Sequence, residues 1–170
     1  MKTTLKLALV IAIVAVCSNV SAQNLKLAHI NMNELIVSMS EYDSAMVKMQ
    51  NIQKDLESEM ENLQVEYRRK YDDYLKVEAT LTEIVKQSRQ QEIQNLMQRI
   101  QMFQESAQQT IEEENNKLMQ PVIEKANKAI EAVAKEQGLT YVINEQTLLY
   151  KALGSTDLLP AVKQNLGIKK

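Results

Sequence analysis

Few residues in this sequence could take part in catalysis, and they form no recognisable pattern. His29 is the single histidine among 170 residues, Cys17 is the single cysteine, and three glycines are the whole supply for a phosphate-binding loop. A lone histidine in a strand is most often a packed or surface residue, and no Cys, His or carboxylate lies near it in sequence to complete a metal site. The sequence therefore predicts no enzyme, no cofactor and no metal ion.

Two short charge clusters could bind ions, but helical geometry argues against both. Consecutive residues of a helix point about 100° apart, so Glu112–Glu114 cannot converge on one cation. Arg68–Lys70 diverge in the same way and are flanked by Glu66 and Asp72. The net charge of −2 also argues against nucleic acid, because phosphate binding draws on clustered cations. We interpret both clusters as solvated helix faces.

Methionine offers an adaptable apolar contact, because its unbranched thioether adjusts to irregular partners. Met49, Met60 and Met97 lie on apolar helical stripes, where they are expected to fill a seam between helices. Met46 and Met102 lie off these stripes and are our predicted contacts to a partner protein. The Gln-rich span 87–109 is interpreted as an uncharged, solvated face; the alternative is that its amides bind an unfolded backbone.

The stretch 41–137 positions these side chains, and its pattern predicts two long amphipathic helices. It contains no glycine and one proline, and apolar residues recur at steps of three and four along both halves. The pattern breaks at residues 77–83, where Thr80 and Glu83 could form a capping box. We predict that the chain reverses there into an antiparallel hairpin, with nearly straight arms of about 38 residues and roughly 55 Å. The alternative is one continuous rod.

Pro121 lies inside the second helical pattern and predicts a hinge. Proline removes one helical hydrogen bond and its ring crowds the preceding turn, so a bend is expected at this residue. The neighbouring polar residues Asn115 and Asn116 interrupt the apolar stripe at the same joint. The alternative is a helix that ends near Gln120, with a new helix beginning at Pro121.

Residues 1–22 predict a secretory signal peptide. Lys2 and Lys6 precede the apolar run 7–16, and a small-residue cleavage site ends at Ala22. Lipidation of Cys17 is not predicted, because Val16 stands where a lipid-attachment site has Gly or Ala. Cleavage would remove both lysines and the cysteine and change the net charge from −2 to −4. An exported chain without disulfides must draw its stability from helix packing and association.

Residues 23–40 and 138–170 are predicted to form a small body at the base of the hairpin, giving an α+β fold that is mostly α. We expect a strand at residues 25–31, a brief helix through 34–37 capped by Asn33, and a hairpin of strands at 139–143 and 147–150. Gly138 suits the left-handed cap of the second long helix. A last short helix is expected between Gly154 and Gly167.

A three-stranded sheet of this size is marginal alone and has exposed edges. Self-association through the body is therefore predicted, with the hairpins projecting from a shared base. The apolar residues expected in the core of this oligomer are Leu27, Ile30, Tyr141, Ile143 and Leu149.

The order of these elements resembles that of the Skp/OmpH family of periplasmic chaperones. The likeness rests on the strand 27–30 followed by Asn31-Met32, on the hairpin, and on the closing segments 141–144 and 149–150, and it extends from Leu25 to Leu166. It implies a homotrimer with a β-barrel-like body and three arms around a cavity. It also implies an ATP-independent holdase that binds unfolded outer-membrane proteins in the periplasm. Met46 and Met102, predicted above from their positions off the stripes, would then be the client contacts.

The sequence departs from the resembled family in two respects. The best-known members are basic, whereas this chain is acidic, so no lipid-binding residues are carried over and only transient contact with a membrane surface is expected. His29 also interrupts a strand that is usually aliphatic. The alternative function is that of a structural or adaptor coiled-coil protein of the cell envelope, which would bind folded partners through its hairpin.

Overall fold

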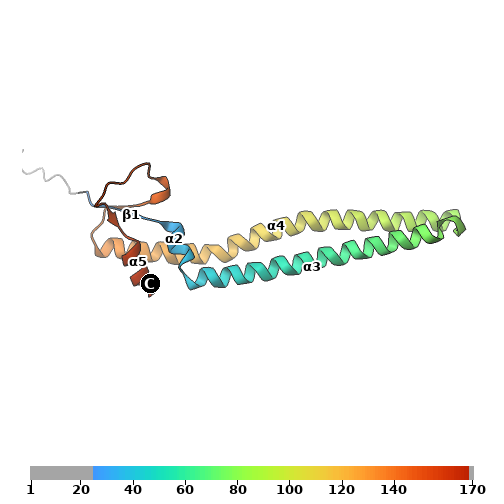
Figure 1. Cartoon of the computed structure of the whole chain (residues 1–170), viewed down its shortest axis with the longest axis horizontal. Helices are drawn as coiled ribbons and strands as arrows, with labels where there is room; N and C mark the ends of the chain where they lie inside the picture. Colours follow the sequence, from blue (N-terminus) through green and yellow to red (C-terminus); the bar gives the residue numbers. More distant parts are fainter. Residues whose placement is uncertain (1–24, 169–170) are drawn as a thin grey trace, which may run out of the picture.

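The computed structural model describes residues 25–168 and shows a small body from which a long helical arm extends (Figure 1). The predicted signal peptide, residues 1–22, lies outside the described residues. Within residues 25–168, no helix is long and apolar enough to cross a membrane. The elements follow in the order β1 (Leu27–Ile30), α2 (Met32–Val37), α3 (Ser40–Val77), the 3-10 helix η1 (Glu78–Thr80), α4 (Glu83–Glu136), β2 (Tyr141–Asn144), the 3-10 helix η2 (Glu145–Thr147), β3 (Thr156–Asp157) and α5 (Leu159–Asn165).

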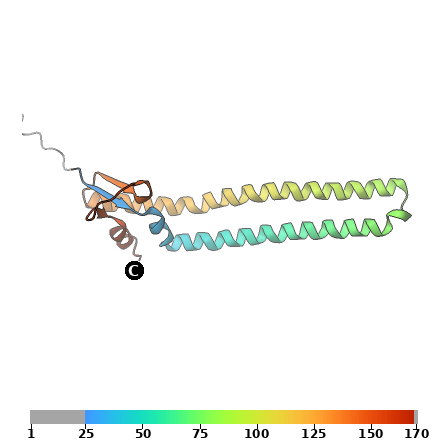
Figure 2. The same ribbon diagram turned by 45° about the horizontal axis from the view of Figure 1, so that its top comes forward.

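The arm is the predicted antiparallel hairpin, and the continuous rod is excluded. Helices α3 and α4 run side by side along its whole length (Figure 2). The chain reverses through η1, where the Thr80 hydroxyl donates to the carbonyl oxygen of Val77 at 2.8 Å. Thr82 then precedes α4 as its cap residue, without a capping hydrogen bond from its side chain. The predicted capping box of Thr80 and Glu83 is therefore wrong.

Helix α4 has 54 residues against 38 in α3, and its last part belongs to the body. It continues through Pro121 without ending, so the alternative of a helix end near Gln120 is wrong. Proline has no N–H, so the carbonyl of Lys117 loses its usual helical donor. In Figure 1 the α4 ribbon changes direction where its colour passes from yellow to orange, around residue 120. Movement about this bend stays a prediction.

The three strands form one parallel sheet in the order β2-β1-β3. Leu27 of the central strand lies opposite Tyr141, and His29 lies opposite Ile143 on one side and Asp157 on the other. The predicted hairpin of residues 139–143 and 147–150 is wrong. The Asn144 side chain accepts from the backbone N–H of Gln146, and the chain turns into η2 and leaves the sheet. It returns to the other side of β1 only at β3.

The helix ends follow from local residues. The side chain of Asn31, and not the predicted Asn33, caps α2 by accepting from the backbone N–H of Glu34 at 3.1 Å. Gly138 ends α4 as predicted, with a φ of 63°. The N–H of Gly138 donates to Lys135, and that of Leu139 donates to Ala134, the pair of bonds typical of a glycine-capped helix. The last helix begins at Leu159, because Thr156 and Asp157 pair with β1 instead.

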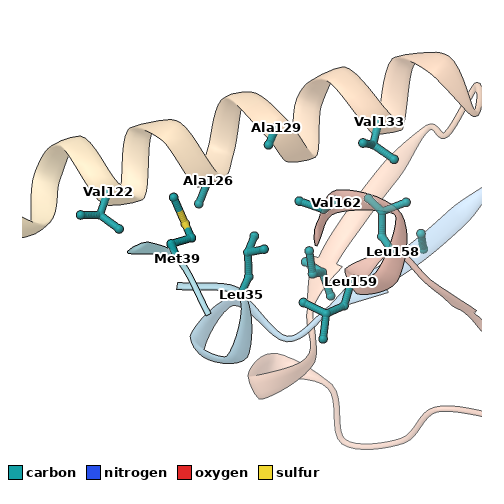
Figure 3. Packing of buried hydrophobic residues seen from close by; sticks show 11 residues of the cluster. Leu35, Met39, Val122, Ala126, Ala129, Val133, Leu158, Leu159 and Val162 are labelled. Atoms are coloured by element: carbon teal, nitrogen blue, oxygen red, sulfur yellow. The ribbon is translucent and has the colours of Figure 1, made fainter. Parts of the chain in front are cut away.

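The hydrophobic core of the body lies where the end of α4 packs on α2 and α5 (Figure 3). Ala126 and Ala129 are small enough to let the two short helices approach α4 closely. The largest side chains of the core that are fully buried come from outside α4: Leu35, Met39, Leu158 and Val162. The body thus includes residues 122–133, together with the described parts, 25–40 and 138–168, of the predicted segments 23–40 and 138–170.

Candidate protein-binding site

The apolar stripes of α3 and α4 pack closely at both ends of the arm and loosely in its middle. Leu63, Tyr74 and Ile93 are buried toward the tip, and Met49 and Val122 are buried toward the body. Between these ends, no residue of 50–62 or 97–121 is buried. The same three-and-four spacing therefore produces two closed ends and an open middle.

The open middle forms a hollow of about 520 Å³ between the two helices, which we call the arm groove. Phe103, Ala107 and Ile111 of α4 face Leu56 and Met60 of α3 across it. All five of these side chains are half-buried, so they keep apolar surface in contact with water. The polar residues that line the groove are Gln53, Glu57, Glu61, Gln64, Gln104 and Gln108.

A second hollow adjoins the arm groove and is lined by residues of α4. It is lined by Gln101, Gln104, Glu105 and Gln108, so it shares two glutamines with the groove. Part of the Gln-rich span therefore borders an apolar surface and is more than a solvated helix face. Among the described residues, no lysine or arginine lines either hollow.

The positions of the methionines differ in part from the predicted ones. Met49 is buried in the seam, whereas Met60 lines the arm groove. Met97 is 54% exposed, so its predicted place inside the seam is wrong. Met102 is 62% exposed and Met46 is half-buried, and neither lines the groove. Both remain predicted contacts, and the structure adds the arm groove as a candidate site that the sequence analysis missed.

The residues predicted for the oligomer core occupy different places in the single chain. Ile30 is 3% exposed and belongs to the chain's own core, and Ile143 is half-buried. Leu27, Tyr141 and Leu149 are exposed, with Tyr141 at the outer strand β2 and Leu149 in the irregular segment that follows η2. Tyr150 and Leu153 of the same segment are exposed as well.

His29 is buried at the centre of the sheet, as a packed residue. Its Nε2 lies 3.0 Å from the Ser155 hydroxyl, and its Nδ1 lies 2.7 Å from a Glu145 carboxylate oxygen. The hydrogen bond from Lys151 is the main cause that lowers the pKa of the Glu145 carboxyl, and the charge of Lys151 adds to it. These partners could not be predicted from the sequence, because they lie far away along the chain; Ser155 is 126 residues from His29.

The order Ser155–His29–Glu145 has the connectivity of a nucleophile, a base and an orienting acid, but other features argue against catalysis. Nδ1 forms no aligned hydrogen bond to Glu145, and that carboxylate is already paired with Lys151. The N–H of Ser155 donates to Ala152, so it cannot stabilise an oxyanion. We interpret the cluster as a link that holds segment 145–155 on β1. Within residues 25–168, no three His, Cys, Asp or Glu side chains form a metal site.

Known proteins share this architecture. A chain of similar fold is found in the crystal structure of a candidate OmpH-like outer membrane chaperone from Caulobacter crescentus CB15, with a TM-score of 0.75 and 13% sequence identity. The match covers 84% of this chain and 83% of that chain. No curated protein sequence matches. The family model for the OmpH-like outer membrane proteins matches residues 26–166, which include the sheet, both helices of the arm and the last helix. The chain therefore belongs to the OmpH-like family.

Proposed function

We propose that this protein is an ATP-independent holdase chaperone, which binds unfolded outer-membrane proteins in the periplasm and prevents their aggregation in transit. Its family and the Caulobacter crescentus protein of similar fold support a chaperone role. The single observation that carries the proposal is the arm groove, an apolar surface left open along an arm that projects from the body. Such a surface can cover apolar side chains that would otherwise aggregate.

Binding of this kind needs no nucleotide if each contact is weak. Covering one large apolar side chain contributes about 1.5–3 kcal/mol before the cost of ordering the bound segment is subtracted. One arm would therefore bind and release a client readily. Several arms on one base would hold the client much longer, because each further contact forms at a high effective concentration. Association of the chains is thus part of the proposed mechanism.

We propose a trimer held together through the body, as the resemblance implies. The exposed residues Leu27, Tyr141 and Leu149 would lie in its interface, while Ile143 and the buried Ile30 support the sheet from within. Within residues 25–168, outer strand β2 pairs only with β1, so its other edge is available to a second chain. Export by the predicted signal peptide would bring the trimer to the periplasm, where transient contact with a membrane surface is expected.

We also propose that the arm pivots on the body at Pro121. Beside this proline lies a cavity of about 510 Å³ between the start of α3 and α4, lined in part by Ser44, Leu118 and Val122. An ion pair between Glu41 and Lys125 crosses the same joint. A missing helical hydrogen bond beside unfilled space gives a compliant joint, and compliance suits a cage that accepts clients of different size.

The function is tested by aggregation of a urea-unfolded outer-membrane barrel protein on dilution, followed by light scattering without nucleotide. We expect the mature protein to suppress scattering, with saturation near one oligomer per client. A matched variant replaces residues 50–113 with a short Gly-Ser linker, which removes most of the arm and keeps the body core. It should associate like the parent and lose suppression. A parent without suppression would favour the adaptor alternative.

A further inference from the structure

We propose that the arm groove binds extended segments in which apolar and polar residues alternate and a lysine or arginine lies close by. This inference rests on the proposed holdase function and assigns it a site and a class of bound segment. It is carried by three independent features of the groove: the spacing of its apolar residues, the free amides on its rim, and its charge.

The apolar residues of the groove have the repeat of an extended chain. Phe103, Ala107 and Ile111 follow at steps of four residues, which is about 6 Å along the axis of α4. Leu56 and Met60 repeat at the same step on α3. Side chains on one face of a strand recur at about 6.6 Å, so successive apolar residues of an alternating segment match successive positions in the groove. Strands of outer-membrane barrels alternate in this way.

The rim of the groove offers hydrogen-bonding groups to a bound backbone. An extended segment that displaces water needs partners for its N–H and C=O groups, and a glutamine amide supplies both a donor and an acceptor. Gln91 and Gln109, which lie outside the groove, donate to Asn95 and Glu113 of their own helix. Four glutamines of the groove, like Gln94 and Gln98 outside it, make no side-chain hydrogen bond within residues 25–168: Gln53, Gln64, Gln104 and Gln108.

The negative charge of the groove favours segments that carry a lysine or arginine. Glu57 and Glu61 are its only charged lining residues, both are exposed, and neither pairs with a cation within residues 25–168. Glu105 adds a third carboxylate in the adjoining hollow. Within residues 25–168, no lysine or arginine lines either hollow. A lysine or arginine of the bound segment would therefore be attracted to these carboxylates.

The probe is a fluorescein-labelled peptide of about 10 residues, the length of a barrel strand, with alternating Val and Thr and a Lys at each end. A second peptide carries Glu in place of Lys, and a third groups the valines of the first into one block. Binding to the full mature protein is followed by fluorescence anisotropy at low salt. We expect the Lys-flanked alternating peptide to bind at least about five-fold more tightly than the Glu-flanked one. The block peptide should also bind more weakly.

Two variants locate the binding, each with a matched control. Ala107→Phe fills the floor of the groove, and Ala79→Phe places the same ring at the arm tip. Glu57→Gln with Glu61→Gln removes the carboxylates of the groove, and Glu59→Gln with Glu112→Gln removes two exposed carboxylates that do not line it. We expect Ala107→Phe to weaken the Lys-flanked peptide at least ten-fold. The double groove variant should lose the preference for Lys over Glu, and both controls should bind like the parent.

Suppression of barrel aggregation is measured on the same samples, so that two failures can be told apart. A parent that suppresses aggregation but binds all three peptides equally keeps the holdase function and overturns the groove assignment. Ala107→Phe binding as tightly as Ala79→Phe overturns it as well. If Ala107→Phe keeps its helix content but changes the mass of the oligomer, the groove is a contact between copies and the proposal is wrong. A parent without suppression overturns the holdase function on which the inference rests.

Discussion

The apolar stripe of helix α4 is buried in the body and open in the middle of the arm. Between Val122 and Val133 its stripe is buried by α2 and α5, with Ala126 fully enclosed. Between Phe103 and Ile111 the stripe has a similar helical spacing and also contains an alanine, Ala107, yet it faces the open arm groove. Packing therefore depends on what the opposite elements place against each turn. A helical stripe can be a core or a binding surface without a change in its own period.

Tyr141→Asp should have the largest effect, because it tests whether the body supplies a closed interface for assembly. In the proposed trimer this position is buried, and an unpaired buried carboxylate costs about 3–5 kcal/mol. Since Tyr141 is 59% exposed in the single chain, the variant should fold but no longer associate. Sedimentation velocity measures the mass, with Tyr141→Phe as the control. If the Tyr141→Asp protein is still a trimer, β2 does not lie in the interface.

Leucine truncation compares the two parts of the chain directly. Leu35→Ala removes a fully buried side chain beside α4 and should lower the free energy of unfolding by about 2–5 kcal/mol. Leu56→Ala removes a half-buried side chain of the arm groove and should cost about 1 kcal/mol. Urea unfolding at one fixed protein concentration measures both. Equal losses would mean that the groove is closed in solution.

Pro121→Ala tests the boundary between these two parts of α4. Alanine restores one helical hydrogen bond and should stabilise the helix by up to about 3 kcal/mol. The arms should stiffen, so the distances between spin labels at Thr82 of each subunit should be less widely distributed. Large clients should then bind less well than small ones. Tip distances that do not change would place the pivot elsewhere or show arms that are already rigid.

Replacing an alanine with leucine should affect stability differently in the body core and in the arm groove. Ala126→Leu inserts three carbon atoms into a filled core and should destabilise the protein by about 1–3 kcal/mol. Ala107→Leu places the same atoms in the arm groove and should change stability by no more than about 0.5 kcal/mol. Thermal unfolding of each variant, compared with that of the parent, measures the two changes in stability. A strongly destabilised Ala107→Leu protein would contradict an open groove.

Acid should weaken both parts by a small amount. Lysine partners lower the pKa values of Glu41, Glu92, Glu131 and Glu145 from the ordinary value of 4.5, chiefly through hydrogen bonds from Lys125, Lys70, Lys135 and Lys151. A carboxyl whose pKa is lower in the folded state stabilises the protein above pH 4.5, and this contribution is lost as the pH falls through the folded value. Urea midpoints should therefore fall below pH 4.5. Glu92→Gln should reduce the decline, and Glu59→Gln should not.

Sequence was sufficient where a short stretch determines its own structure. The two arm helices, the reversal near Thr80 and the left-handed cap at Gly138 depend on residues within a few turns of one another. The sheet depends on partners far away in the chain. Asn144-Glu145-Gln146 resembles the turn of a hairpin, but the side chain of Asn144 directs the chain into η2 and away from antiparallel pairing.

The arm groove lay beyond sequence reasoning for a different physical reason. Leu56, Met60 and Phe103 keep the period of their buried neighbours, so the pattern alone cannot reveal that the stripes fail to close. Two signals could have pointed to it: the small Ala107 in the middle of the stripe, and the polar run 112–116 directly after it. The partners of His29 were equally hidden, because Glu145 and Ser155 approach it only once the parallel sheet has formed.

The central position of β1 has a consequence for how the molecule folds. Both neighbours of this strand come from the far end of the chain, at residues 141–144 and 156–157, so its backbone has no sheet partner until almost the whole sequence is present. The arm, by contrast, joins residues that are near in sequence around its tip and can form by local nucleation and zippering. Because distant contacts form slowly, the arm should fold first and bring the two halves of the body together. The folded hairpin would then hold β1 close to β2 and β3, so that the sheet can form more quickly.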